Sequence, residues 1–134
     1  MFIPNLSFLT VQVCILIVLK HFFDIDVLNL HLLSFIIFIG GCYITYVKQF
    51  LVYNRFDISG KVLHIGNLLF HIIPFIYIWS QYTLNKEYIL ETLVYMLIYV
   101  YMYNPKKKYY ISDKEYRLYG MLMVLLIILF YIVI

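Results

Sequence analysis

The chain of 134 residues is 65% hydrophobic and only 13% charged, with a mean hydropathy of +0.92. Because a soluble domain is typically about half apolar and about a quarter charged, this composition excludes an ordinary water-soluble fold and predicts one membrane-embedded domain. The formal net charge of +3 is small and no nucleic-acid-binding module is visible, so we expect no nucleic-acid partner.

Five hydrophobic runs are candidates to cross a bilayer as helices, since about 20 residues at about 1.5 Å each span about 30 Å of hydrocarbon. The last two runs are short and imply local thinning of the bilayer or flanking tyrosines at the interface. Backbone amides cannot remain unpaired in lipid, and the runs lack the strict alternation of barrel strands, so helices are expected. The predicted fold class is therefore all-α, a polytopic transmembrane helical bundle. Its expected spans are residues 3–23, 27–47, 62–82, 88–104 and 118–134.

Most basic residues lie in two alternate connections of this expected bundle. Inner loops of membrane proteins are enriched in lysine and arginine, so both connections and the N-terminus are expected inside, and the C-terminus outside. Segment 48–61 mixes aromatic with charged residues and is either an interfacial amphipathic piece or a solvated loop. The second of the two connections includes candidates for binding anionic headgroups, which otherwise act only as a topology signal. The two sets are Lys48, Arg55 and Lys61, and Lys106, Lys107, Lys108, Lys114 and Arg117, of which Lys106, Lys107 and Lys108 are the headgroup candidates.

Polar side chains recur at helical spacing within the second and third spans. Polar groups in a span usually face other helices, so these side chains are expected to form an intramembrane polar stripe inside the bundle. Matching the two spans by depth places Thr45 opposite His64 and Gly41 beside Asn67, and Pro74 is expected to kink the third span. The predicted stripe consists of His64, Asn67, His71, His31, Ser34 and Thr45.

One acidic residue lies inside an expected span. Glu91 is about one turn into the fourth span, at the depth at which His31 enters the second. A Glu91–His31 ion pair or hydrogen bond is therefore expected, and the alternative is that Glu91 reaches the lipid headgroups.

Three classes of function are compatible with these residues. Histidines in a helical bundle can ligate haem, although His64 and His71 stand about 10 Å apart on one helix and cannot hold one iron together. Ionisable groups within spans can also mark a path for protons or ions. The third class is a structural or assembly protein that binds other membrane subunits and uses these groups for helix packing. No catalytic set or metal-binding spacing is visible, so we expect no enzyme activity, no metal and no cofactor.

The runs LLFHIIPFIYIW (residues 68–79) and TLVYMLIYVYMY (residues 92–103), in a chain without alanine, resemble the small hydrophobic respiratory-complex subunits encoded by ciliate mitochondrial genomes. The resemblance is compositional and extends over the whole chain. It implies a subunit of a respiratory complex in the mitochondrial inner membrane, with its basic loops in the matrix, and it carries no site residues over. A small multi-pass membrane protein of a large DNA virus would share this A+T-driven composition and is the alternative.

Overall fold

The computed structural model describes residues 9–46, 60–103 and 112–134, and within these ranges the chain is all-α, which confirms the all-α part of the prediction. Five helices coincide closely with the five hydrophobic runs. The third helix is continuous over residues 60–81 but consists of three consecutive pieces. The helices are α1 (Leu9–Phe23), α2 (Leu30–Tyr46), the third with α4 (Gly60–Asn67), η1 (Leu68–Ile72) and α5 (Ile73–Gln81), α6 (Ile89–Tyr103) and α8 (Asp113–Val133).

The last helix begins at Asp113, five residues before the start expected from hydropathy alone. Its first turn is polar, and a reciprocal capping arrangement stabilises it. The hydroxyl of Ser112 accepts a hydrogen bond from the Glu115 amide at 3.2 Å and donates one to the Glu115 carboxylate at 3.2 Å. A hydropathy window misses such a turn because the cap satisfies backbone amides without adding apolar residues.

A left-handed residue ends the first helix. Asp24 has φ 52°, the Asp24 amide donates to the Lys20 carbonyl at 3.1 Å, and the Ile25 amide donates to the Leu19 carbonyl at 3.4 Å. This is the pattern in which glycine is most common, and aspartate tolerates it better than most residues do. The Lys20 ammonium lies 2.7 Å from the Asp24 carboxylate and lowers the pKa of that carboxyl below its ordinary value.

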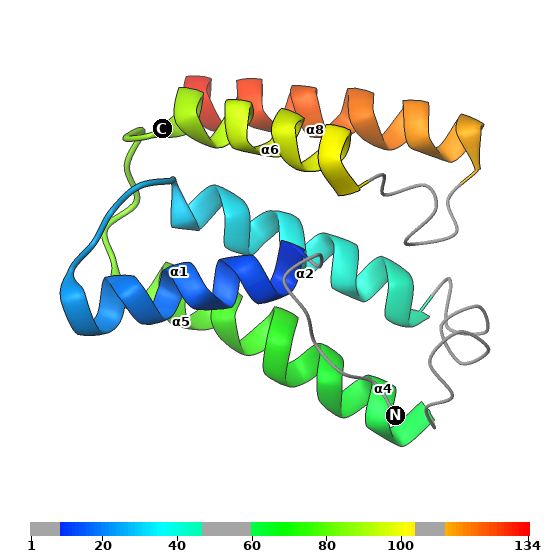
Figure 1. The fold of residues 1–134 in the computed structure, drawn as a ribbon, viewed down its shortest axis with the longest axis horizontal. Helices are drawn as coiled ribbons and strands as arrows, with labels where there is room; N and C mark the ends of the chain where they lie inside the picture. Colours follow the sequence, from blue (N-terminus) through cyan, green and yellow to red (C-terminus); the bar gives the residue numbers. More distant parts are fainter. Residues whose placement is uncertain (1–8, 47–59, 104–111) are drawn as a thin grey trace.

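The helices form an antiparallel bundle in which α6 and α8 lie side by side over α1 and α2, with residues 60–81 along the opposite side (Figure 1). The connections that follow α1 and α5 meet at one end, where Asn29 bonds to Asn85. The C-terminal turn of α8 reaches the same end, since the Lys86 ammonium lies 5.0 Å from the Tyr131 ring centroid. At the opposite end the Tyr43 hydroxyl donates to the Glu115 carboxylate at 2.8 Å.

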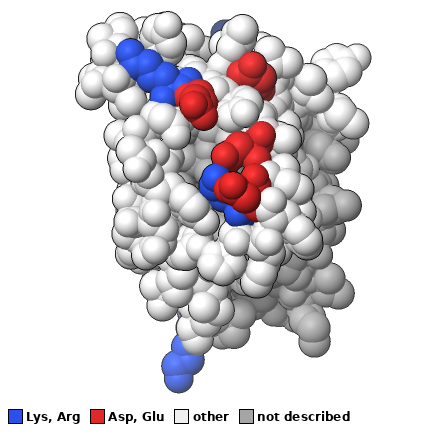
Figure 2. Space-filling view, turned by 90° about the vertical axis from the view of Figure 1, so that its left-hand side faces the viewer, with Lys and Arg blue, Asp and Glu red and all other residues white. Residues whose placement is uncertain are grey.

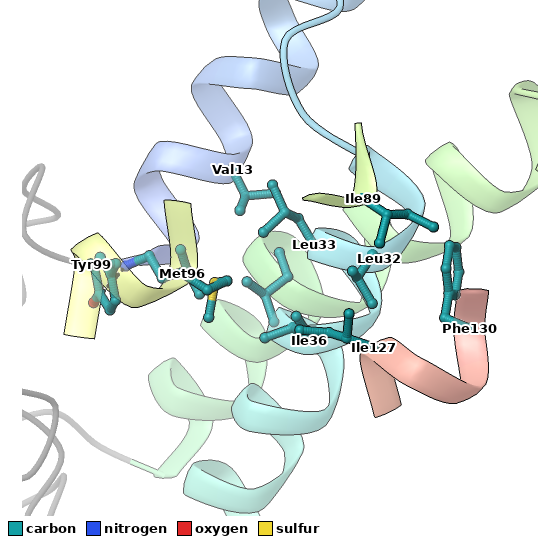
Figure 3. Close-up of a cluster of buried hydrophobic side chains, with 11 residues drawn as sticks. Val13, Leu32, Leu33, Ile36, Ile89, Met96, Tyr99, Ile127 and Phe130 are labelled. Carbon is teal, nitrogen blue, oxygen red and sulfur yellow. Dashed lines mark hydrogen bonds between the residues drawn. The ribbon is translucent and has the colours of Figure 1, made fainter. Parts of the chain in front are cut away.

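Helix α2 lies at the centre of the bundle. Its first five residues, from Leu30 to Ser34, are all buried, so the helix is covered on every side at this level rather than along one stripe. Side chains from α1, α6 and α8 converge on it to form one apolar core (Figure 3). The buried members of this core are Leu9, Val13, Leu32, Leu33, Ile36, Ile37, Ile89, Met96, Tyr99, Ile127 and Phe130.

The third helix widens into a π-turn directly before Pro74. The amide of Ile73 donates to the carbonyl of Leu68, five residues back, instead of to the carbonyl four residues back. A proline has no amide hydrogen, and its ring collides with the carbonyl four residues earlier. The wider turn accommodates the proline ring within a continuous helix. The kink expected at Pro74 is therefore replaced by a π-turn.

The outer surface of the bundle is strongly apolar. Four leucines of α8, Leu118, Leu122, Leu125 and Leu129, recur at helical spacing and are 50% to 56% exposed. By length and composition, α8 is the one helix in the described ranges that could cross a membrane, and only 11% of its apolar window is buried. Three shorter apolar helices accompany it, Leu9–Phe23, Leu30–Tyr43 and Ile89–Met102.

Charged side chains gather at the end where the connections after α1 and α5 meet, among residues without charge on the same face (Figure 2). Lys20 pairs there with both Asp24 and Asp26, at 2.7 Å and 2.8 Å. Among the residues that the structure describes, these are the ion pairs found at this end.

Asn29 connects the segments that meet at this end. Its side-chain carbonyl accepts from the Leu32 amide at 3.0 Å and so caps α2, while its side-chain amide donates to the carbonyls of Asn85 at 3.0 Å and Glu87 at 2.9 Å. The Asn29 backbone amide donates to the Thr92 hydroxyl at 2.8 Å. One buried residue therefore fixes the start of α2 against the α5–α6 connection and against α6.

Replacing Asn29 should reduce stability for two reasons, the loss of the cap of α2 and the loss of the bonds to the α5–α6 connection. Asn29→Ala removes the cap and leaves two carbonyls without their donor, which should cost about 2 kcal/mol of unfolding free energy. Asn29→Asp keeps an acceptor for the Leu32 amide but loses both donated bonds, so it should also lower the melting temperature in detergent micelles. Asn85→Ala is the matched control, because that side chain bonds only within its own turn. Equal effects of the Asn29 and Asn85 alanine variants would contradict the assignment.

Candidate functional site

A polar group that joins helices inside the bundle is His71, in the π-turn. Its Nδ1 lies 3.0 Å from Oδ1 of Asn67, and its Nε2 lies 3.0 Å from the hydroxyl of Thr10 on α1. Because Asn67 Oδ1 can only accept, Nδ1 carries a proton, and in the neutral ring Nε2 then accepts from the Thr10 hydroxyl. The imidazole therefore joins the first and third helices with both nitrogens in use.

Helix α2 reaches this centre through a glycine. A Cβ atom built on Gly41 would lie 2.3 Å from Cγ and 2.4 Å from Nδ1 of His71, so no larger residue fits without movement. The small residue allows close approach, as the sequence indicates. Its partner, however, is His71 rather than the expected Asn67, one turn along the third helix. His71 thus contacts three helices through Thr10, Gly41 and its own neighbour Asn67.

The remaining members of the predicted stripe have different surroundings. Thr45, Ser34 and Asn67 are buried, whereas His64 is exposed and lies with its ring centroid 5.6 Å from that of Tyr46. The hydroxyl of Ser34 donates to the carbonyl of His31 within its own helix. The stripe therefore divides into an interior part around His71 and an end position occupied by His64.

His31 lies at the charged end and takes a partner other than Glu91. Its Nε2 lies 3.0 Å from the carbonyl of Tyr82, and the Trp79 ring packs edge-on at a centroid distance of 5.4 Å. The structure leaves the Glu91 side chain exposed and does not bring it to His31. The chain leaves the third helix at Tyr82 directly above His31, so a backbone carbonyl takes the place expected for the carboxylate.

Several polar contacts involve residues outside the predicted stripe. Gln12 on α1 accepts a hydrogen bond from the Tyr95 hydroxyl, and the Leu9 amide donates to the Tyr99 hydroxyl at 3.1 Å. Tyr95 and Tyr99 are four residues apart and lie on one face of α6. Tyrosine is abundant in this chain, so their spacing alone could not distinguish them from the other tyrosines.

A small cavity opens at the charged end beside His31. Its volume is about 190 Å³, and Lys20, Asp26, Asn29, His31 and Tyr82 are among the residues that line it. The polar groups facing it are already engaged, since Lys20 pairs with Asp26 and His31 with Tyr82. The cavity is therefore a cleft whose charged and histidine side chains are paired within the protein.

Two sets of predicted residues lie outside the described ranges. Lys106, Lys107 and Lys108, the candidates for headgroup binding, fall in residues 104–111. Most of the segment 48–61, including Lys48 and Arg55, falls in residues 47–59. These expectations remain predictions.

The chain was compared with protein families, with curated protein sequences and with solved structures, and none of them matches it. The role of its polar residues is therefore inferred from their geometry in this chain.

The buried polar groups of the described residues form hydrogen bonds within the bundle. In the described part of the chain, every buried side-chain nitrogen and oxygen has a hydrogen-bond partner. Neither nitrogen of His71 is open to an axial ligand or a transferred proton unless Asn67 or Thr10 moves. A group of three or more histidine, cysteine, aspartate or glutamate side chains with metal-binding geometry does not occur among the described residues.

The contact between Gly41 and His71 predicts that alanine substitutions at the adjacent glycines Gly41 and Gly40 change stability in opposite directions. Gly41→Ala places a methyl group against the imidazole and should lower stability by about 1–3 kcal/mol. Gly40→Ala meets nothing within 4 Å and should raise stability by about 0.5–1 kcal/mol, because alanine favours the helix. Melting temperatures in detergent micelles measure both effects.

A double variant tests the cause. In a His71→Ala background the Gly41→Ala substitution should cost little, because the ring that it strikes is gone. If the cost of Gly41→Ala persists in that background, the close approach to His71 is not its origin.

Proposed function

We propose that this chain is a polytopic membrane protein with a structural or assembly role, and that it is a subunit of a larger membrane complex. The observation that carries the proposal is the distribution of polarity. Apolar side chains are exposed on the flanks of the bundle, and hydrogen-bonded polar side chains are buried inside it beside the apolar core.

The interior is the first support. Six polar residues are at most 5% exposed, and those whose bonds are described have side-chain or backbone partners. Polar residues buried between helices are typical of membrane bundles, where they join helices that hydrophobic burial does not hold together. The six are Asn29, His31, Ser34, Thr45, Asn67 and Thr92.

The exterior is the second support. Large apolar side chains are exposed on every described helix, for example Ile15 at 43%, Ile76 at 56%, Leu97 at 61% and Leu129 at 56%. Monomeric soluble proteins rarely expose a contiguous apolar patch of more than a few hundred Å². Lipid chains, or helices of other subunits, would cover such flanks.

The lengths of the helices fit a bilayer with local adjustment. Helix α8 has 21 residues and α2 has 17, which correspond to about 31 Å and about 25 Å of rise. Shorter spans are accommodated by thinning of the bilayer or by flanking tyrosines and charged residues at the interface.

The charges support a defined orientation. The end that carries Asp24, Asp26 and Glu87 is the outer one in this proposal, while Lys61 and the start of α8 with Lys114 belong to the inner end. The resemblance to ciliate mitochondrial subunits makes the inner side the mitochondrial matrix and the complex a respiratory one. Hydrogen bonds within the bundle then fix the shape that the other subunits contact.

Single cysteines test both insertion and sidedness. In a Cys14→Ala, Cys42→Ala background, Lys61→Cys and Lys114→Cys should react with a membrane-impermeant maleimide from one side of sealed vesicles. Lys86→Cys, in the connection after α5, should react only from the other side. Leu125→Cys is the matched control, because its side chain is 53% exposed but should lie in hydrocarbon and react from neither side.

Two outcomes would contradict the proposal. Reaction of Leu125→Cys as fast as Lys86→Cys would place the apolar flank in water. Reaction of Lys61→Cys and Lys114→Cys from opposite sides would exclude the proposed arrangement of the spans.

A further inference from the structure

An apolar groove with a volume of about 370 Å³ lies on the flank of the bundle, where α1 and α6 are neighbours. Apolar side chains of α1 and of the connection that follows it form most of its lining. Gln12 and Tyr95, which are hydrogen-bonded to each other, line it as well. The apolar members are Ile15, Leu16, Val27 and Leu28. A mostly apolar pocket with a few polar groups is typical of sites that bind hydrophobic ligands.

The groove leads into the charged end of the bundle. Leu28 lines both the groove and the cavity of about 190 Å³ beside His31. On α1, Lys20 lies one turn beyond Leu16 on the same helical face and lines that cavity. In the connection after α1, Asp26 directly precedes Val27 and also lines the cavity. Both segments therefore change from apolar to charged in the same direction, from the flank toward the end.

The dimensions of the groove match one lipid chain. Gln12 and Lys20 are eight residues apart on α1, which is about 12 Å of rise, and half of a hydrocarbon core of about 30 Å is about 15 Å. Over that length the volume of 370 Å³ leaves a channel about 5–6 Å wide, whereas a helix with its side chains is about 10–12 Å across. The groove is therefore too narrow for a helix of another subunit and wide enough for an extended hydrocarbon chain, whose carbons pack about 4 Å from their neighbours.

From this arrangement we infer that the groove and the cavity together bind one phospholipid whose headgroup carries a primary ammonium. One acyl chain lies in the groove, and the ammonium donates hydrogen bonds to carboxylates of the charged end. The lipid belongs to the leaflet next to that end. The inference rests on the proposed function, because it needs a bilayer around the bundle.

The charges of this end favour an ammonium over an anionic headgroup. Among the described residues of the cavity and its ion pairs, three carboxylates, those of Asp24, Asp26 and Glu87, accompany the ammonium of Lys20. Lys20 is already paired with two of them, and the Asp24 side chain is 86% exposed. The Lys86 ammonium lies instead over an aromatic ring of α8. A headgroup ammonium therefore finds acceptors here, whereas a headgroup with a net negative charge meets an excess of like charge.

The test adds lipids to the purified full chain in mild detergent and measures their occupancy by native mass spectrometry. Phosphatidylethanolamine, phosphatidylcholine and phosphatidylglycerol with the same acyl chains are compared. Phosphatidylethanolamine should reach an occupancy about fivefold or more above that of phosphatidylglycerol, because its charges are complementary to those of the site. Phosphatidylcholine should bind less than phosphatidylethanolamine, because a quaternary ammonium has no hydrogen to donate.

A filled groove tests the position of the chain. Val27→Trp places an indole in the groove and should lower the occupancy by phosphatidylethanolamine about fivefold or more, because the two compete for one volume. Val124→Trp on α8 is the matched control, since both valines are 48% exposed, and it should leave the occupancy unchanged. An unchanged melting temperature shows that each variant is folded.

A second pair of variants tests the headgroup. Asp24→Asn combined with Glu87→Gln removes two of the carboxylates and should bring the occupancies by phosphatidylethanolamine and phosphatidylglycerol to within about twofold of each other. Glu91→Gln is the control, because this exposed carboxylate is on α6 and is not part of the cavity lining. It should leave the preference as it is in the unmodified chain.

The outcomes separate this inference from the proposed function. A chain that stays in solution without detergent and takes up no lipid overturns both. A chain that needs detergent but binds none of the three lipids, or binds them equally, overturns only the inference. Undiminished binding in Val27→Trp, or an undiminished preference in the Asp24 and Glu87 double variant, overturns it as well.

Discussion

Hydrogen bonding inside the bundle constrains how the helices can pack. In the proposed membrane setting no water is available to a buried polar atom, so each one needs a partner within the protein. His71 meets this requirement through Asn67 and Thr10, and Gly41 lets α2 close over the ring. Asn29 does the same at the charged end, where it bonds to two backbone carbonyls and caps α2. The relative positions of the helices thus follow from a few directional contacts within a largely non-directional apolar packing.

Hydropathy was sufficient to predict the helices because each one is a nearly continuous apolar run. The boundaries depend on local chemistry that hydropathy does not measure. Helix α8 starts five residues early because Ser112 and Glu115 satisfy its first amides. Helix α1 ends because Asp24 adopts a left-handed conformation next to Lys20. Both signals are present in the sequence, but they are read as capping patterns rather than as hydrophobicity.

The sequence predicted which polar residues belong to the site better than it predicted which partners they contact. Spacing placed Asn67 and His71 on one helical face, and the small residue Gly41 on the facing helix. The register between the helices differs by one turn, since Gly41 lies against His71 rather than against Asn67. The expected partner of His31 was a carboxylate, and the observed partner is the Tyr82 carbonyl. A backbone group at a chain reversal leaves no mark in a sequence pattern, so spacing alone could not reveal this partner.

The π-turn lies where three helices meet. Pro74 has no amide hydrogen, and the Ile73 amide before it bonds to the Leu68 carbonyl, five residues back. His71 belongs to this turn, and its ring bonds to Thr10 of α1 while Gly41 of α2 lies against it. The backbone irregularity therefore coincides with the position at which a directional polar contact, rather than apolar packing alone, joins α1 and α2 to the third helix.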